Sequence, residues 1–319
     1  MLTYLLRRLL FAAALVFTVS SGALLLTRLA PGDYATDALG IGASRERLAG
    51  MRAKYGLDRP IADQYRDWLA GTLRFDFGRS LAYDRPVADL IPERAANTAI
   101  LASAALIAAT LVGLPLGIVS GSRPGGALSG LIRAGSVVLL SMPPLLTSLL
   151  LVFAAARTGW LPVGGMQSGA GSGSGSGAAL LDLLRHLVVP ALALALPLAA
   201  MFERLQSEAM HEVLGQPYVV AALARGVPRS RVLWRDALKA ALVPVASVYG
   251  LAVGSLLSGS FVVEIITTWP GLGRLMLEAL RARDVYLVAG CAATGSLFLA
   301  CGTLLSDAAL ALVDPRARE

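Results

Sequence analysis

The residues that could carry out hydrolytic chemistry are few in this 319-residue chain. Its only histidines, His186 and His211, stand in neither a His-Glu-x-x-His nor a Gly-x-Ser-x-Gly setting. No Gly-x-x-x-x-Gly-Lys-[Ser/Thr] phosphate loop occurs, and the only lysines are Lys54 and Lys239. The motifs therefore predict no catalytic, cofactor-binding or metal site in this chain. An intramembrane hydrolase stays an alternative without a motif to support it.

A more informative pattern is the basic stretch Tyr218–Val245, which reads YVVAALARGVPRSRVLWRDALKAALVPV. It carries five basic residues and one acid in a chain of which only 15% is charged. Pro217 suits the first turn of a helix, and Gly226 suits the position just past its end. The spacing predicts a two-turn helix, a glycine turn and a second, basic helix that runs into the next apolar segment.

Three interpretations of this stretch compete. It could be an anchor whose arginines meet lipid phosphate. It loosely resembles a DNA-reading helix-turn-helix, but its position between two apolar segments argues against nucleic acid. It could also be a knob that docks into a partner protein, because small alanines allow close approach and arginines supply charge complementarity.

A second motif, TTWPGLGRL, precedes the last apolar segment. Pro270, Gly271 and Gly273 are expected to force turns, and Trp269 suits a membrane interface. This pattern fits a constriction or an ordinary interfacial turn. These four residues are the candidates for an outer gate.

Acidic residues in or beside apolar segments are further candidates. An acid within a membrane span is a functional candidate by default, which applies to Asp307, although its place near the end of an apolar segment favours a structural role. Glu264 and Glu278 flank the TTWPGLGRL motif and could meet the amino terminus of a peptide.

Composition identifies the elements that must position these residues. The chain is 56% hydrophobic with a mean hydropathy of +0.67, whereas about a quarter of the residues of a soluble domain are charged. Runs of about 19 residues or more without a charge can cross a bilayer as helices. Five such runs, and a shorter sixth at Leu187–Phe202, predict an all-α protein with six transmembrane helices: Leu9–Thr27, Ala95–Ser122, Ala134–Ala156, Ala240–Val263 and Val285–Ser306.

The positive charges set the expected orientation. Arg7 and Arg8 precede the first run; they are also compatible with a cleaved signal, but the long apolar stretch favours an uncleaved span with a cytoplasmic N-terminus. Six spans then return the C-terminus to the cytoplasm. The expected divisions are a first helix at 1–30, an external helical cap at 31–94, a core at 95–313 with a cytoplasmic loop at 203–241, and a tail at 314–319.

Two outer segments add to this plan. Within the cap, two short helices broken at Asp58–Pro60 are expected, and Tyr65, Trp68 and Leu69 should form one apolar stripe. Ser168–Gly177 has the composition of a flexible linker. Cys291 and Cys301 are ten residues apart in one span, too far for a disulfide.

The cytoplasmic stretch resembles the EAA coupling loop of ABC-importer permeases, whose pattern is Glu-Ala-Ala, three residues, then Gly. Ala221, Ala222 and Gly226 match, whereas Val220 stands in place of the glutamate and Lys239 where many members have proline. The segments YGLDRPIADQYRDWLAG, FDFGRSL, WLPVGGM, EVLGQPYVVAALARGV, WPGLGR and DPRAR follow the order seen in dipeptide/oligopeptide/nickel permeases. Over nearly the whole chain, the protein is similar to their B-type subunit.

The resemblance implies a type I importer permease in the inner membrane of a bacterium. Such subunits pair with a homologous permease, rest on two cytoplasmic ATPase subunits that bind ATP and Mg, and receive substrate from an external binding protein. Peptides are the expected substrate, with nickel chelates or glycosides as alternatives; an ion-driven secondary transporter would show intramembrane charges and repeated halves. The residues expected to couple to the ATPase are Tyr218, Ala221, Ala222, Arg225, Gly226 and Arg229.

Overall fold

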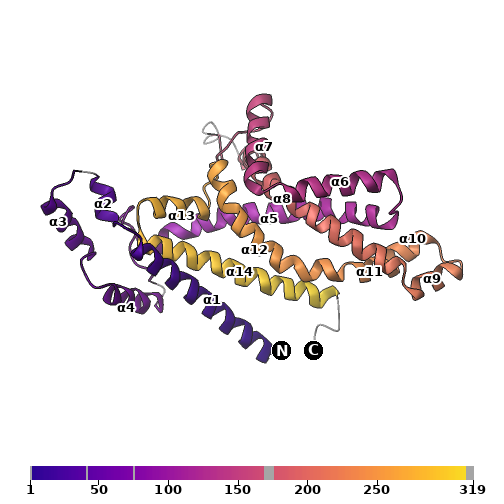
Figure 1. Ribbon diagram of the computed structural model, residues 1–319, viewed down its shortest axis with the longest axis horizontal. Coiled ribbons are helices and arrows are strands. Elements are labelled where there is room, and N and C mark those ends of the chain that lie inside the picture. Colours follow the sequence, from indigo (N-terminus) through magenta and orange to yellow (C-terminus); the bar gives the residue numbers. More distant parts are fainter. Residues whose placement is uncertain (1, 41, 75, 169–175, 314–319) are drawn as a thin grey trace. The chain divides into compact units, whose positions relative to one another are not determined.

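The computed structural model describes residues 2–40, 42–74, 76–168 and 176–313, and all elements below lie within these ranges (Figure 1). Apart from an isolated antiparallel bridge between Arg79 and Pro86, the regular structure of these residues is helical. The prediction of an all-α protein is therefore confirmed. The α-helices are α1 (Leu2–Leu29), α2 (Tyr34–Leu39), α3 (Arg45–Tyr55), α4 (Ile61–Thr72), α5 (Val87–Ser122), α6 (Ala127–Ser141), α7 (Pro144–Thr158), α8 (Ser176–Leu214), α9 (Pro217–Ala224), α10 (Arg229–Arg231), α11 (Leu238–Ala241), α12 (Val243–Ile266), α13 (Leu272–Arg281) and α14 (Val285–Val313), with a π-helix at Val232–Ala237.

Among the described residues, five helices are long and apolar enough to cross a membrane: α1, α5, α8, α12 and α14. A sixth crossing is possible only if α6 and α7 count together, and these two helices are bent by 104°. The expected span Ala134–Ala156 is therefore not one continuous helix, and it counts as a single crossing only as this bent pair. Met142 and Pro143 each precede a proline, which disfavours helical geometry, and both are extended (ψ 114° and 150°).

The expected fourth span Leu187–Phe202 is only the middle of α8, a continuous helix of 39 residues. Pro190 and Pro197 lie inside this helix without ending it. Helices α6, α7 and α12 all pack against α8, so the prolines lie in a helix that is surrounded by protein, where proline is tolerated. Part of the expected cytoplasmic loop 203–241 is thus helical, since α8 continues to Leu214.

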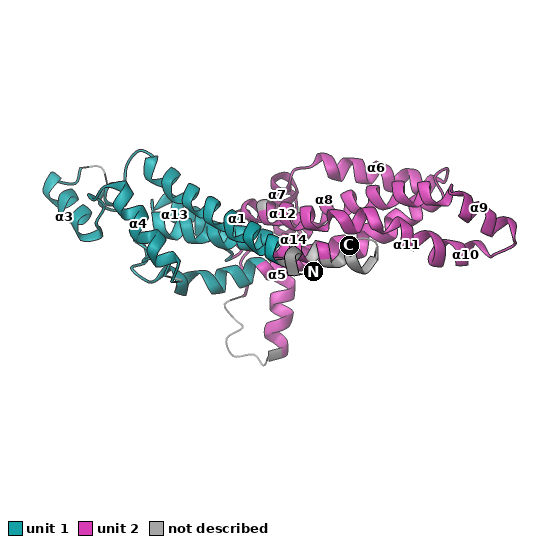
Figure 2. Ribbon diagram, turned by 90° about the horizontal axis from the view of Figure 1, so that it is seen from below, with its two compact units in different colours: residues 1–98, 270–300 teal, residues 99–269, 301–319 magenta. Residues whose placement is uncertain are grey.

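The chain divides into two compact units, shown in different colours in Figure 2. Unit 1 comprises the described residues of 1–98 and 270–300, and unit 2 those of 99–269 and 301–319. The expected linker Ser168–Gly177 and the tail 314–319 fall mostly or wholly outside the described residues. Each unit has a hydrophobic core of its own.

In unit 1, the buried side chain of Asp284 joins the loop before α5 to the start of α14. Its carboxylate accepts hydrogen bonds from Ser80 Oγ at 2.5 Å and the Ala82 amide at 3.0 Å. The other carboxylate oxygen caps α14 by accepting from the Leu287 amide at 3.1 Å. One fully buried carboxylate thereby satisfies three donors, as a buried charge requires.

The cap helices pack on α1 and α14 through the predicted apolar stripe. Trp68 is buried beside Leu24 and Val285, and Tyr65 and Leu69 pack against the same cluster. Helix α3 ends at Tyr55 and α4 begins at Ile61, which confirms the break at Asp58–Pro60.

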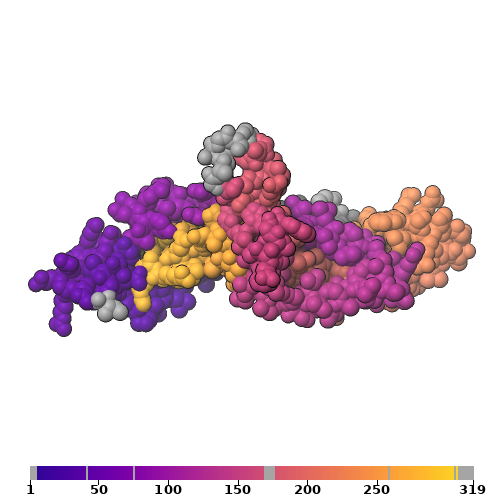
Figure 3. All heavy atoms as spheres, turned by 90° about the horizontal axis from the view of Figure 1, so that it is seen from above, coloured from indigo at the N-terminus to yellow at the C-terminus, as the bar shows by residue number. Residues whose placement is uncertain are grey.

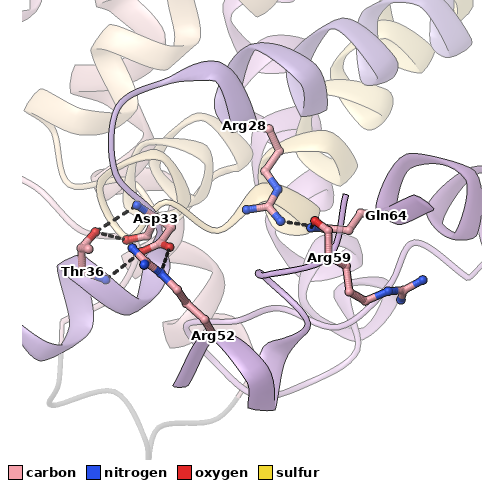
Figure 4. A network of polar contacts seen from close by, with 6 residues as sticks. All are labelled: Arg28, Asp33, Thr36, Arg52, Arg59 and Gln64. Atoms are coloured by element: carbon pink, nitrogen blue, oxygen red, sulfur yellow. Dashed lines mark hydrogen bonds and ion pairs between the residues drawn. The ribbon is translucent and has the colours of Figure 1, made fainter. Parts of the chain in front are cut away.

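Polar contacts hold the cap together (Figure 4). Arg28, in the last turn of α1, donates to Gln64 Oε1 on α4, and Gln64 Nε2 donates to the Arg59 carbonyl at 2.7 Å. Asp33 caps α2 by accepting from the Thr36 amide, and it forms an ion pair with Arg52 Nε on α3 at 2.6 Å. Burial opposes ionisation of Asp33, but the hydrogen bonds from Arg52 and Thr36 outweigh it and lower the pKa of this carboxyl.

We expect Asp33→Ala to destabilise the cap by about 1 kcal/mol, the usual value of an N-cap side chain. Because the folded-state pKa of Asp33 lies below its unfolded value, its contribution is complete above about pH 4 and is lost as the pH falls through the folded-state pKa. Thermal unfolding of both proteins in detergent between pH 3 and 7 tests this expectation. The difference between their midpoints should shrink at acid pH; a constant difference would contradict the assigned role of the charge.

In unit 2, α5 approaches α8 unusually closely. Gly113, Gly117 and Gly121 recur at intervals of four along α5, on one face of the helix. A Cβ added at Gly117 would lie 2.6 Å from Gln206 Cβ and 2.7 Å from the Glu203 carbonyl oxygen, and additions at the other two glycines would meet α8 backbone at 2.5 Å. The contact therefore depends on the missing side chains, as in small-xxx-small packing of membrane helices.

Aromatic and hydroxyl side chains complete the core of unit 2. Phe202 on α8 stacks on Tyr249 of α12 with ring centroids 5.0 Å apart. The Tyr249 hydroxyl lies 2.7 Å from Thr110 Oγ1 on α5. These contacts join α5, α8 and α12 in the N-terminal part of α12.

Candidate functional site

Helix α9 forms the centre of the predicted coupling segment. Pro217 occupies its first turn, and Gly226 follows it with a φ of +82°. The chain then turns back sharply, because the Val227 amide donates to the Ala222 carbonyl at 3.2 Å. A positive φ is costly for residues with a side chain. The predicted helix start and the predicted glycine turn are both confirmed.

One face of α9 is buried and the other is exposed. Val219 and Ala222 pack against Val232, with Leu214 and Val227 at the edge of the cluster. Of the six predicted coupling residues, Ala222 therefore lies on the inner face. The other five are exposed: Tyr218, Ala221, Arg225, Gly226 and Arg229.

Val220 and Leu223 belong to the exposed face as well, and sequence reasoning missed them. Their exposed fractions are 53% and 40%. The signal available in the sequence was the presence of these two large apolar residues in a short predicted helix outside the predicted membrane spans. In the space-filling view, the orange segment around α9 and α10 protrudes at one end of its unit (Figure 3). We call this segment, residues 216–231, the knob.

A helical connection links the knob to α12. It runs through α10, the π-helix Val232–Ala237 and α11, and the chain enters α12 after a turn at Leu242. Ala237 and Ala241 are fully buried against Ile118 of α5 and Met210 of α8. The expected run into the fifth span is thus present, although its first part is π-helical. π-helices occur frequently at functional sites.

A cavity of about 850 Å³ lies between α8, α9 and the start of α12. Its charged lining residues are of both signs: Arg225, Arg235 and Lys239 against Glu212 and Asp236. A second cavity of about 330 Å³ between α6 and α8 is also of mixed charge, with Arg133 and Arg204 opposed by Glu203 and Glu208.

The predicted outer-gate residues fall in two units. Trp269 belongs to unit 2, where it is fully buried in the main core, so its side chain packs inside the protein and does not face lipid. The Gly165 amide donates to the Thr267 carbonyl at 2.9 Å, and Met166 packs against the same core. Gly165 and Met166 of the WLPVGGM segment therefore lie beside Thr267 and the core cluster that contains Trp269.

Pro270, Gly271 and Gly273 belong to unit 1. Asn97 Nδ2 donates to the Pro270 carbonyl at 2.9 Å. Gly271 is the extended N-cap of α13, but Gly273 is buried inside that helix, so it does not form a turn as expected. Thr268, with a φ of +51°, provides the left-handed residue of this connection instead.

The three candidate acids have different surroundings. Glu264 is fully buried in α12. Glu278 on α13 accepts from the Tyr83 hydroxyl at 2.9 Å and from Arg274 Nε at 3.1 Å. Burial, and next the hydrogen bond to Glu278, raise the pKa of Tyr83. Asp307 lies in the last turns of α14.

Comparison with known proteins decides the family. Residues 113–319 match the family described as "Binding-protein-dependent transport system inner membrane component". Residues 1–102 match the family described as the N-terminal part of such a membrane component. The chain belongs to this family. It is therefore a multi-pass membrane component of a transport system, and the resemblance inferred from its motifs is confirmed.

Relatives align with the chain from end to end. It is 32% identical to the "Oligopeptide transport system permease protein AppB" of Bacillus subtilis (strain 168) over 318 residues, which cover 99% of each chain. It is 32% identical to the "Dipeptide transport system permease protein DppB" of Escherichia coli (strain K12), with 100% of this chain and 99% of the relative covered. A "Glutathione transport system permease protein GsiC" of Escherichia coli O1:K1 / APEC is 30% identical, with 100% and 99% covered.

Proposed function

We propose that the protein is one of two permease subunits of an ATP-driven peptide importer. The observation that carries this proposal is the full-length similarity to permeases named for oligopeptides and dipeptides. In this proposal, an external binding protein delivers the peptide, and the chain forms half of the translocation path together with a homologous permease. ATP and Mg are bound by two cytoplasmic ATPase subunits.

The knob is proposed to dock on one ATPase subunit. Its exposed face combines apolar Val220 and Leu223 with the positive charge of Arg225, which suits a groove with apolar walls and an acidic rim. Because the inner face of α9 packs on Val232, displacement of the knob should be passed through the π-helix and α11 to α12. ATP binding by the partner would then tilt a membrane span.

The gate is proposed to lie where α12 ends. Trp269 fills the core of unit 2, and the extended Gly271 is the N-cap from which α13 begins. Motion of α12 would therefore move Trp269. The expected cap at 31–94 would lie outside the cell, facing the binding protein.

An uptake assay tests the proposed substrate. The permease pair and the ATPases are reconstituted in proteoliposomes with the binding protein, and uptake of radiolabelled di- and oligopeptides is measured with and without ATP. We expect ATP-dependent uptake that requires the binding protein. Uptake of nickel chelates or glycosides but not of peptides would overturn the substrate assignment, as would uptake driven by ions alone.

The proposed orientation has a separate test. In a background with Cys291→Ser and Cys301→Ser, a single cysteine at exposed Ala224 should react with a membrane-impermeant maleimide only after the inner membrane is opened. A matched Ala38→Cys variant in α2 should react in intact spheroplasts, because the cap is expected outside. Labelling of Ala224→Cys from outside would reverse the assigned topology and remove the docking proposal.

A further inference from the structure

A third cavity in unit 2 differs in charge from the two described above. Its volume is about 540 Å³, and it lies between the end of α5, the start of α6 and the segment α10 with the following π-helix. Its charged lining residues are Arg123 and Arg229, and its lining contains no carboxylate. A cavity whose fixed charges are all positive favours an anion.

Two hydrogen bonds order the segments that carry these arginines. Arg229 Nη2 donates to the Ser122 carbonyl at the end of α5, at 3.0 Å. The Arg123 carbonyl accepts from Ser129 Oγ at 2.7 Å, which ties the α5–α6 turn to α6. Each guanidinium has five N–H donors in a planar fork that suits phosphate oxygens, so the bond from Arg229 to Ser122 leaves donors for a ligand.

The remaining wall of the cavity is apolar and partly aromatic. Ile118, Val119, Leu128, Leu233 and Trp234 contribute to it, and the exposed fraction of Leu128 and of Trp234 is 61%. α5 is a candidate membrane span that ends at Ser122, beside this cavity. A tryptophan next to arginines at the end of a span is typical of the membrane–water interface.

We propose that this cavity binds the headgroup of an anionic phospholipid, with its phosphate between Arg123 and Arg229 and its acyl chain along Leu128 and Trp234. A free phosphate would satisfy the arginines but would leave the apolar wall in water, so the lipid accounts for both halves of the cavity. Such a lipid site would be present whichever substrate the protein transports.

The site would connect lipid composition to coupling. Arg123 follows α5, whereas Arg229 lies in the knob, three residues after Gly226. A phosphate bound by both would link the end of a membrane span to the segment that is proposed to meet the ATPase. Anionic lipid would thereby stiffen the base of the knob.

Quenching of Trp234 fluorescence by brominated lipids tests the proposal in the full-length protein. The protein is placed in nanodiscs of phosphatidylcholine with a small fraction of brominated phosphatidylglycerol or brominated phosphatidylcholine. The signal of Trp234 is obtained by subtracting that of Trp234→Phe. We expect the anionic lipid to be preferred on the order of tenfold, since each basic residue near the surface contributes roughly fivefold.

Charge-matched variants identify the site. Arg123→Gln should reduce the preference several-fold, whereas Arg231→Gln, which removes an exposed arginine of the same segment that does not line this cavity, should leave it unchanged. Equal quenching by both lipids, or equal loss in both variants, would overturn the proposal in favour of a general surface charge effect. Displacement of the lipid signal by millimolar inorganic phosphate would overturn the lipid assignment in favour of a soluble anion.

Discussion

Gly117→Val should prevent most of the protein from reaching its folded state in the membrane. The new Cβ alone would lie 2.6 Å from Gln206 Cβ and 2.7 Å from the Glu203 carbonyl oxygen. Overpacking of a core costs about 1–3 kcal/mol when neighbours can adjust. Here one neighbour is backbone of α8, which also packs against α6, α7 and α12, so we expect a cost at the upper end of that range or above it.

The measurement is the yield of monodisperse, membrane-extracted protein, followed by its resistance to unfolding in mixed detergent. We expect the folded yield of Gly117→Val to fall on the order of tenfold or more, since each 1.4 kcal/mol is a factor of ten. Gly135→Val is the matched control, because a Cβ at this exposed position of α6 meets nothing within 4 Å. A near-normal yield of Gly117→Val, or an equal loss in both variants, would show that the glycine contact is not decisive.

Gly226→Val should leave the protein folded and inserted but should abolish most ATP-driven uptake. A Cβ at Gly226 meets nothing within 4 Å, so no steric clash with neighbours is expected. The penalty comes from the φ of +82°, which costs a residue with a side chain about 1–3 kcal/mol. The turn would relax toward negative φ and would redirect α9 relative to the helical connection that follows it.

Uptake and ATP hydrolysis in proteoliposomes separate coupling from folding. For Gly226→Val we expect uptake reduced about tenfold or more, since a changed direction of the knob misplaces its docking face, while extraction yield stays normal. The uptake of Gly226→Asn should lie between that of the unmodified protein and that of Gly226→Val, because asparagine tolerates left-handed geometry better than valine. Gly215→Val, in the same loop but without positive φ, serves as the control. Normal uptake in Gly226→Val would refute the role of this turn.

Much of the site could be read from local sequence. Pro217 and Gly226 mark the ends of α9 because proline lacks an amide donor and glycine accepts positive φ, and both effects depend only on the residue itself. The membrane spans follow from the lack of charge over long runs for a similarly local reason. The glycines at 113, 117 and 121 carried a signal of the same kind that was overlooked.

Other features depended on contacts between distant residues. Helix α8 continues through Pro190 and Pro197 in a stretch that packs against α6, α7 and α12. The burial of Trp269 and the sharing of Asp284 between two loops were not visible in the residues themselves.

The sequence by itself thus determined the helical class, the apolar spans and the ends of the knob, because each depends on the intrinsic conformational or solvation preference of neighbouring residues, while its motifs indicated the family by resemblance. Only the tertiary structure decided which face of α9 is exposed and which arginines share a cavity without an acid. The shared cavity depends on residues more than a hundred positions apart, Arg229 and Ser122, and no local preference specifies that contact.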